Sequence, residues 1–310
     1  MLPYTFHHIG LTSALNVMLD TLTKYQKTGN STFALTIMIP TWNNLKYLKN
    51  CIKSLQKNST HKIQIIVIVN EGKDGTKEWL EKQNDIDFIH SPSNLGICYG
   101  LNCVRSMVRS EYLVYVNDDM YLLPNWDVVI LKEIEAIGSK NFMLSCTAIE
   151  PIDTGNPCVV VKDFGLDIEH FDEERLLKEY KNLYTNDWNG STWPPTIVHV
   201  DLWDLVGGLS IEFSPGMYSD PDFSKKLYEA GVRNFKGLGN SMVYHFVSKS
   251  TKRIKKNRGK RTFLLKWGIT SRTFSEKFLK KGKVYNGEIE TIKLDKKSVL
   301  INKLKKIISC

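Results

Sequence analysis

The chain has 310 residues, of which 42% are hydrophobic and 11% aromatic, and this composition excludes a predominantly disordered protein. Its formal net charge of +9 favours anionic partners such as nucleotides, nucleic acid or an acidic membrane surface, but charge alone does not choose among them. No stretch approaches the roughly 20 apolar residues that a membrane-spanning helix needs. We therefore expect a protein that is soluble or lies on a membrane surface.

The six cysteines form no C-x-x-C pair and show no spacing typical of disulfides, and the N-terminus lacks a secretory signal. We therefore expect reduced thiols and a cytoplasmic location, with the inner face of the membrane as the alternative.

Residues 1–32 are predicted to form a helical extension. Apolar residues recur at helical spacing over residues 11–24, and the polar residues 29–32 then end the pattern as a loop. We expect one helix here that packs on the following domain.

From residue 33 the chain alternates between strand and helix patterns. The predicted strands are residues 34–39, 63–69, 87–90 and 112–116. The predicted helices between them are residues 45–55, 77–83 and 97–109. Strands that alternate with helices at this spacing indicate an α/β fold with a mostly parallel sheet and helices on its faces.

The second half of the chain has a less regular pattern. The predicted elements are helices at 124–137, 202–206 and 222–230 and strands at 142–146 and 241–246, with a charged and aromatic insertion at 167–184. After residue 248 the chain becomes strongly basic and ends in a short amphipathic pattern. Two interpretations of this end stay open, namely a solvated cationic helix face and peripheral contact with an anionic leaflet.

The strand at 112–116 ends in the polar triplet Asn117-Asp118-Asp119. Ligands of open α/β sheets bind just beyond the carboxyl ends of the strands, which is where this triplet lies. Carboxylates in that position suit a hard divalent cation that also holds a substrate diphosphate.

Several short motifs occur in the order and spacing of the family-two glycosyltransferases, which the segment 33–246 resembles. They are Pro40-Thr41-Trp42-Asn43, Val69-Asn70-Glu71-Gly72 with Asp74-Gly75-Thr76, Asn94-Leu95-Gly96, Asn117-Asp118-Asp119, Gly207-Gly208, Ser219-Asp220-Pro221-Asp222 and His245. The resemblance implies the GT-A fold, a Rossmann-like sheet with flanking helices, and use of nucleotide sugars. It divides the chain into an N-terminal extension (1–32), a GT-A domain (33–248) and a basic helical C-terminal extension (249–310).

The resemblance also implies a set of residues that bind the nucleotide sugar. They are Pro40, Thr41, Asn43, Asn70, Glu71, Asn94, Gly96, Asn117 and Asp118. Many family members have Asp at the position of Asn70, and an amide both donates and accepts hydrogen bonds whereas a carboxylate only accepts. This departure leaves the base open, with a UDP-sugar favoured and GDP or dTDP as alternatives.

By the same resemblance, Asp119 and His245 are the metal ligands, for Mn²⁺ or Mg²⁺. Asn117 stands where the family's D-x-D motif has its first Asp. The competing interpretations are a polar turn that caps the helix after Pro124, and a structural role for His245.

Asp220 matches the family's catalytic base, and Asp222 is the second choice. A carboxylate at this position would take the proton of the acceptor hydroxyl in a single displacement, which inverts the anomeric centre. The competing interpretation is that Ser219 or Asp220 caps the helix that Pro221 starts.

The sequence therefore predicts an inverting, metal-dependent glycosyltransferase that adds one sugar to a cell-surface glycan or glycolipid, as in bacterial polysaccharide or lipopolysaccharide synthesis. Asn70, Asn117 and Ser219 also allow a catalytically impaired nucleotide-sugar-binding protein of the same fold. A nucleotidyltransferase would show a glycine-rich basic loop after the first strand, which residues 40–44 lack. We expect no binding of nucleic acid, because no recognisable reading motif is present.

Overall fold

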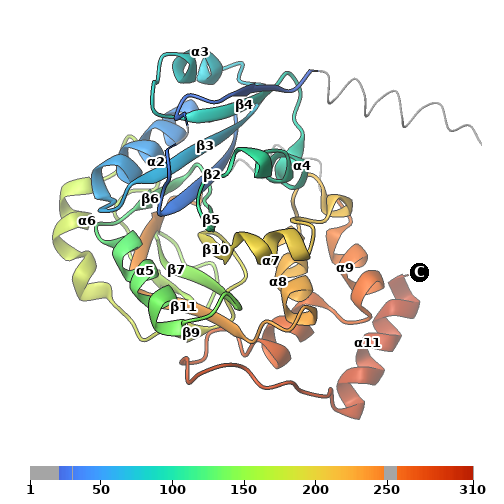
Figure 1. Ribbon diagram of the computed structural model, residues 1–310. Coiled ribbons are helices and arrows are strands. Elements are labelled where there is room, and N and C mark those ends of the chain that lie inside the picture. The colour runs from blue at the N-terminus through green and yellow to red at the C-terminus, as the bar shows by residue number, and fades with distance from the viewer. Residues whose placement is uncertain (1–20, 30, 248–256, 310) are drawn as a thin grey trace, which may run out of the picture.

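The computed structural model describes residues 21–29, 31–247 and 257–309. Within these residues the chain forms one eleven-stranded sheet with helices on both faces (Figure 1). The strands are β1 Thr23–Tyr25, β2 Leu35–Trp42, β3 Ile63–Asn70, β4 Asp87–Ser91, β5 Tyr112–Tyr115, β6 Met120–Leu122, β7 Phe142–Glu150, β8 Val159–Val161, β9 Trp188–Asn189, β10 Thr196–His199 and β11 Asn234–His245. The helices are α2 Leu45–Asn58, α3 Thr76–Glu81, α4 Gly96–Cys103, α5 Trp126–Ile137, α6 Glu173–Glu179, α7 Val200–Leu205, α8 Ser219–Glu229, α9 Gly259–Trp267, α10 Ser271–Thr273 and α11 Lys296–Ser309.

The strand order is β1-β4-β3-β2-β5-β10-β7-β11-β6, and β8 and β9 pair with β7 and β11. The consecutive pairs among β4, β3, β2 and β5 are parallel, which confirms the βαβ prediction for the first half of the domain. β10 runs antiparallel between β5 and β7, and β6 runs antiparallel to β11. The sheet therefore joins a parallel half to a mixed half at β10.

Side chains of the central strands alternate between two hydrophobic clusters, one on each face of the sheet. Ile37 and Ile39 lie in the cluster under α2 and α5, whereas Met38 lies in the cluster under α4, α7 and α8. This alternation follows from the two-residue period of a strand. Because both faces are covered, the strands are almost wholly apolar.

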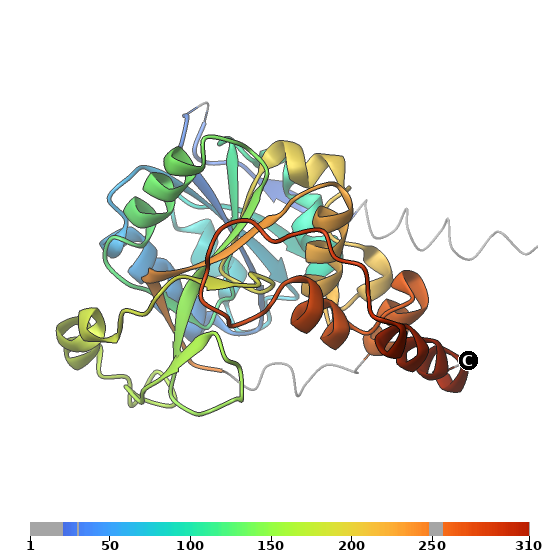
Figure 2. The same cartoon turned by 90° about the horizontal axis from the view of Figure 1, so that it is seen from below.

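The C-terminal segment shares the core of the domain. Phe263 of α9, Phe274, Leu279 and Ile289 belong to the same buried cluster as the sheet residue Met38. Figure 2 shows the chain after α10 returning along the sheet before it enters α11, and Trp188 of β9 forms an isolated bridge with Val284 of this returning segment. The basic end therefore begins as an integral layer of the fold, while the domain limits given above stay a prediction.

The predicted N-terminal helix falls almost entirely outside the described residues. Its last two residues were predicted wrongly, because Thr23–Tyr25 form β1, which pairs antiparallel with β4 at the edge of the sheet. Tyr25 stacks on Phe88 with ring centroids 4.1 Å apart, a contact that favours the strand there. Among the described residues, no helix has the length and the apolar character to cross a bilayer.

Candidate functional site

A cleft of about 380 Å³ opens beyond the carboxyl ends of β2, β3 and β5, a size in the usual range for small-molecule sites. The predicted site residues that line it are Pro40, Thr41, Asn70, Asn94, Gly96, Asn117, Asp118, Asp119, Asp220 and His245. Three further predicted residues, Asn43, Glu71 and Asp222, do not line this cleft. The structure thus gathers in one place residues from six separate stretches of the sequence.

Asn70 ends β3 and joins two loops at the floor of the cleft. Its side-chain amide donates to the Thr41 carbonyl at 3.2 Å, and its oxygen accepts from the Leu95 amide at 2.8 Å. The residue is 3% exposed. An ionised aspartate could not donate to the Thr41 carbonyl, so this local geometry suits an amide.

Gly96 begins α4 in a left-handed conformation, with φ of +72°. A Cβ atom at this position would lie 2.6 Å from Pro215 Cα, because the loop before α8 packs directly against it. The Asn94 side chain accepts from the Gly96 amide at 2.8 Å and completes the turn. A glycine is therefore required where these two walls of the cleft meet.

Asn43 and Glu71 form a ring of contacts at the rim. Asn43 Nδ2 donates to Glu71 Oε2 at 3.1 Å, and the Lys73 amide donates to Asn43 Oδ1 at 2.7 Å. The ammonium of Lys73 lies 3.2 Å from Glu71, and this contact lowers the pKa of the Glu71 carboxyl. These residues hold the β2–α2 and β3–α3 loops together beside the cleft.

Asp118 ties the end of β5 to the β2–α2 loop. Thr41 Oγ1 donates to its Oδ2 at 2.6 Å, and Asn44 Nδ2 donates to its Oδ1 at 3.0 Å. Helix α5 begins at Trp126 after Asn125. The alternative that the triplet only caps this helix is therefore wrong for Asp118, whose carboxylate accepts hydrogen bonds from Thr41 and Asn44.

Strand register brings Asp119, His245 and a third residue, Glu150, together. His245 pairs with Met120 across β11 and β6, and the parallel β7–β11 pair sets Tyr244 beside Ile149. His245 Nε2 consequently lies 3.5 Å from Asp119 Oδ1, and its Nδ1 lies 3.0 Å from Glu150 Oε1. Sequence reasoning missed Glu150, although it has the signal that found the triplet, a carboxylate at the end of an apolar run.

The imidazole of His245 is strongly biased toward its charged form. Burial opposes this charge, but the Asp119 carboxylate and then Glu150 more than offset it and raise the pKa of His245 to about 10. Thr154 Oγ1 donates to the second oxygen of Glu150 at 2.8 Å and fixes that carboxylate. The contact at Nδ1 leaves Nε2 for the cleft, as in metal-binding histidines, and a cation that binds there must replace the Nε2 proton.

Within the described ranges, no group of three or more His, Cys, Asp and Glu side chains is arranged to hold a metal ion. The carboxylate of Asp119 and the imidazole of His245 nevertheless lie side by side at the wall of the cleft. This donor set fits a cation such as Mn²⁺ that takes its other ligands from a substrate diphosphate and water.

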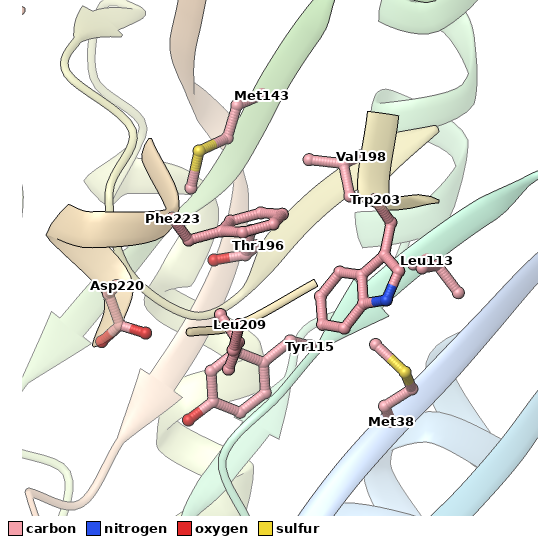
Figure 3. A pocket seen from close by; sticks show the side chains of 10 residues that line it. All are labelled: Met38, Leu113, Tyr115, Met143, Thr196, Val198, Trp203, Leu209, Asp220 and Phe223. Carbon is pink, nitrogen blue, oxygen red and sulfur yellow. The ribbon is translucent and has the colours of Figure 1, made fainter. Parts of the chain in front are cut away.

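Asp220 lies in the first turn of α8, where the cleft meets a small apolar cavity (Figure 3). The cavity is lined mainly by apolar side chains, namely Met38, Leu113, Tyr115, Met143, Val198, Trp203, Leu209 and Phe223. Desolvation in this setting raises the pKa of the Asp220 carboxyl to about 7. A carboxylate with such a pKa is suited to exchange protons at neutral pH.

The capping interpretation of this segment is wrong. The residue before α8 is Tyr218, and it makes no side-chain cap. Ser219 Oγ donates to the Gly216 carbonyl at 2.6 Å instead of accepting from the helix. The Asp220 carboxylate is therefore not used to start the helix.

Asp222 is fully buried and anchors the C-terminal segment. It accepts from Ser210 Oγ at 2.6 Å and from Trp267 Nε1 at 2.7 Å, and it lies 3.0 Å from Lys266 Nζ. None of these three partners lines the cleft. The structure therefore separates the two aspartates, with Asp220 at the cleft and Asp222 in a polar anchor.

The sequence of the chain is similar to that of known glycosyltransferases. Residues 36–160 match the model of the family described as Glycosyl transferase family 2. The chain is 25% identical over 171 residues to a Bacillus subtilis (strain 168) protein named "Putative glycosyltransferase EpsH". That match covers 52% of this chain and 45% of the relative, so the chain spans less than half of the relative's length.

Solved structures share the fold at low sequence identity. Residues 1–349 of S. aureus TarS in complex with UDP-GlcNAc superpose with a TM-score of 0.54 at 13% identity, covering 75% of this chain and 66% of that one. GalNAc-T7 with UDP, GalNAc and Mn²⁺ gives a TM-score of 0.55 at 11% identity, covering 79% of this chain and 50% of that one. These likenesses confirm the GT-A fold that the sequence predicted.

Proposed function

We propose that the chain, whose residues 36–160 match the model of glycosyl transferase family 2, transfers a sugar from a nucleotide-sugar donor to a glycan or glycolipid acceptor. The observation that carries this proposal is the position of Asp220. Its carboxyl has a pKa of about 7 and lines the same cleft as Asp118 and Asp119. A group that can accept a proton and the carboxylates proposed to lie near the donor diphosphate thus line one cleft, which has the size of a small-molecule site.

The reaction that we propose is a single displacement with inversion. Asp220 accepts the proton of an acceptor hydroxyl while that oxygen forms a bond to the anomeric carbon of the donor. The bond from the same carbon to the diphosphate breaks, and its electron pair leaves with the diphosphate. At the anomeric carbon one bond forms and one breaks, the hydroxyl proton passes to the Asp220 carboxylate, and no covalent bond forms between the sugar and the protein.

The residues that would hold a divalent cation are Asp119 and His245, with Glu150 orienting the imidazole. When bound, a cation supplies positive charge that stabilises the departing diphosphate. Mn²⁺ is favoured because an imidazole is among the ligands. GalNAc-T7, which shares the fold, was solved with Mn²⁺, and this supports the proposal.

The nucleoside would lie between the ends of β2 and β3, near Thr41 and Asn70. We favour a UDP-sugar, since the TarS structure contains UDP-GlcNAc and GalNAc-T7 contains UDP. GDP and dTDP sugars are the alternatives that the test below distinguishes.

A thermal-shift scan of UDP-, GDP- and dTDP-sugars with and without MnCl₂ tests the donor. We expect one nucleotide class to raise the melting temperature, and to do so more strongly with Mn²⁺, because a ligand that binds only the folded state stabilises it. No shift from any nucleotide sugar would overturn the proposal.

Asp220→Asn then tests the base. Transfer should be lost while the donor-induced thermal shift is retained, since the substitution removes a proton acceptor and keeps the shape of the side chain. Asp201→Asn serves as the matched control, because Asp201 lies on the surface of α7 in a solvent-exposed ion pair with Lys140. Retained turnover in Asp220→Asn would contradict the assignment.

A nucleotide-sugar-binding protein without activity is the second candidate, favoured by Asn117 and Ser219. A donor shift without transfer to any acceptor, and without slow hydrolysis of the donor, would support it. The geometry of Asn70 adds nothing to this candidate, because its amide fits its own hydrogen bonds.

We also propose that the acceptor belongs to the cell envelope and is met at the inner face of the membrane. Support comes from α11, which exposes a set of apolar side chains among lysines. They are Leu300, Ile301, Leu304, Ile307 and Ile308, with Lys303, Lys305 and Lys306. A helix of this composition suits an anionic membrane surface.

A further inference from the structure

A second hollow, of about 750 Å³, lies where α9, α10 and α11 meet the loop before α8. Five of the residues that line it are cationic, namely Arg258, Lys260, Arg261, Arg272 and Lys305. Among its described lining residues there is no carboxylate. The hollow, hereafter the basic groove, therefore gathers cationic side chains on one surface.

Buried polar contacts fix the walls of the basic groove. Asn302 of α11 is 2% exposed, and its oxygen accepts from the Thr270 amide at 2.9 Å and from Thr273 Oγ1 at 3.2 Å. α11 thereby packs beside α9, as Figure 2 shows near the C-terminus. Lys305 lies one turn beyond this anchor, so its position on the groove follows from the anchored helix.

The opposite wall contacts the loop that leads into α8, the helix that carries the proposed base. Asn257 Nδ2 donates to the carbonyls of Phe213 at 2.7 Å and Met217 at 3.2 Å. A Cβ atom at Gly259 would lie 2.3 Å from the Met217 carbonyl oxygen, so α9 begins in direct contact with this loop. The groove and the cleft therefore share a built wall.

Met217 and Tyr218 line both the basic groove and the cleft. Tyr218 adopts a left-handed conformation with φ of +73°, and the chain then enters α8, whose second residue is Asp220. A molecule that lies in the groove and passes over Tyr218 reaches the Asp220 carboxylate. The donor's diphosphate corner, by contrast, belongs to Asp119 and His245.

The lining selects the chemistry of the occupant. Several cations, three of them arginines, favour a phosphate or diphosphate, because guanidinium groups bind phosphate oxygens in pairs. Arg272 also lies 3.3 Å from Glu276, but this surface pair is exposed and weak, so it competes little with a phosphate. Met217, Leu264 and Ile308 add apolar surface along the same groove.

We propose that the basic groove binds the anionic part of the acceptor, a phosphate or diphosphate esterified to an apolar chain, and so places the acceptor sugar at Asp220. The proposal rests on the proposed function for the identity of the bound molecule as acceptor. An uncharged glycan would use the apolar lining but not the cationic side chains. A phosphate on an apolar chain uses both the charged and the apolar lining.

The test measures binding of farnesyl diphosphate to the full chain by calorimetry, with inorganic pyrophosphate and farnesol as companion probes. Arg258→Gln/Lys260→Gln should weaken binding of farnesyl diphosphate at least about tenfold, as expected for loss of charge-assisted hydrogen bonds. Lys296→Gln/Lys297→Gln is the matched control, because it removes the same charge from exposed positions of α11 outside the groove lining.

Each outcome has a defined meaning. Equal weakening in the two double variants would show unspecific attraction by net charge and overturn the proposal, as would no weakening in either. If pyrophosphate binds as tightly as farnesyl diphosphate, the proposal that the groove binds an apolar chain is overturned. If farnesol binds as tightly as farnesyl diphosphate, the proposal that the groove binds a phosphate is overturned.

The outcome is separable from that of the donor scan. Loss of all donor shifts with intact groove binding would remove the transferase function and keep the groove as a phospholipid-type site. A normal donor shift without groove binding would remove this acceptor subsite alone. The groove variants should also leave the donor shift unchanged, which shows that they fold.

Discussion

The Asp220 carboxyl has a pKa of about 7 in the folded protein because burial disfavours its charge, whereas its ordinary value is 3.8. Between these two values the folded protein holds a proton that the unfolded chain has already released. The free energy of unfolding therefore falls as pH rises through this window. Under the proposed mechanism, activity has the opposite dependence, because only the ionised carboxylate accepts a proton.

We predict opposite pH profiles for stability and transfer. From about pH 5 to about pH 8 the melting temperature of the wild type should fall relative to that of Asp220→Asn, which cannot ionise. Over the same range the transfer rate of the wild type should rise with an apparent pKa near 7. Differential scanning fluorimetry and a pH–rate profile measure the two. Parallel melting profiles for wild type and variant would contradict the buried-carboxyl account.

Glu150 contacts Nδ1 of His245, and under the proposed function a substitution of Glu150 should weaken metal binding without changing a residue that lines the cleft. Glu150→Gln keeps an acceptor for Nδ1 but removes the charge that orients and polarises the ring. We predict a loss of Mn²⁺ affinity of about 10- to 100-fold, the range for partners of metal-binding histidines. Titration of free Mn²⁺ by electron paramagnetic resonance measures this. Glu174→Gln, on the exposed side of α6, is the control, and equal affinities in the two variants would exclude the role of Glu150.

Among the elements, α8 carries the proposed base and is clamped by the C-terminal segment. Asp222 binds Trp267 and Lys266, and the Lys225 ammonium lies 5.4 Å from the ring centroids of Trp267 and Phe278. Cation–π contacts of this kind add to the apolar packing. The segment after residue 257 therefore sets the position of the cleft wall, and it cannot be treated as a detachable tail.

α11 differs, because its apolar side chains are exposed. We predict that vesicles with phosphatidylglycerol bind the protein and that pure phosphatidylcholine vesicles bind it less, since lysines near an anionic surface each add about 1 kcal/mol. Leu304→Ser/Ile307→Ser should abolish co-flotation. Leu205→Ser, at an exposed apolar position on α7, should not. Unchanged flotation of the α11 variant would remove membrane contact from the proposal.

At the scale of the whole molecule, the parallel half of the fold could be predicted because each strand carries its own signal. The apolar runs that became β2, β3, β4 and β5 are each followed by polar residues, and the structure confirms all four. The polar residues that follow these strands make up most of the predicted residues that line the cleft. The nucleotide, metal and base roles themselves stay predictions.

What the sequence could not show depends on contacts between distant segments. β10 is only four residues long, and its place between β5 and β7 follows from pairing with both. The resemblance ranked Asp220 above Asp222, but only the contacts of Asp222 with Ser210, Lys266 and Trp267 show that Asp222 is an anchor. Glu150 lies beside His245 because of the register between β7 and β11, and a local sequence pattern cannot predict this register.

The pairing of His245 with Met120 also has a consequence for the order of folding. β6 and β11 are far apart along the chain, so the corner that holds Asp119 beside His245 cannot form until the last long strand has docked. Cation-dependent donor binding would then be absent from any partly folded species that lacks β11. In a refolding experiment, the recovery of nucleotide-sugar binding should lag behind the recovery of helical signal, and would time the final step of assembly.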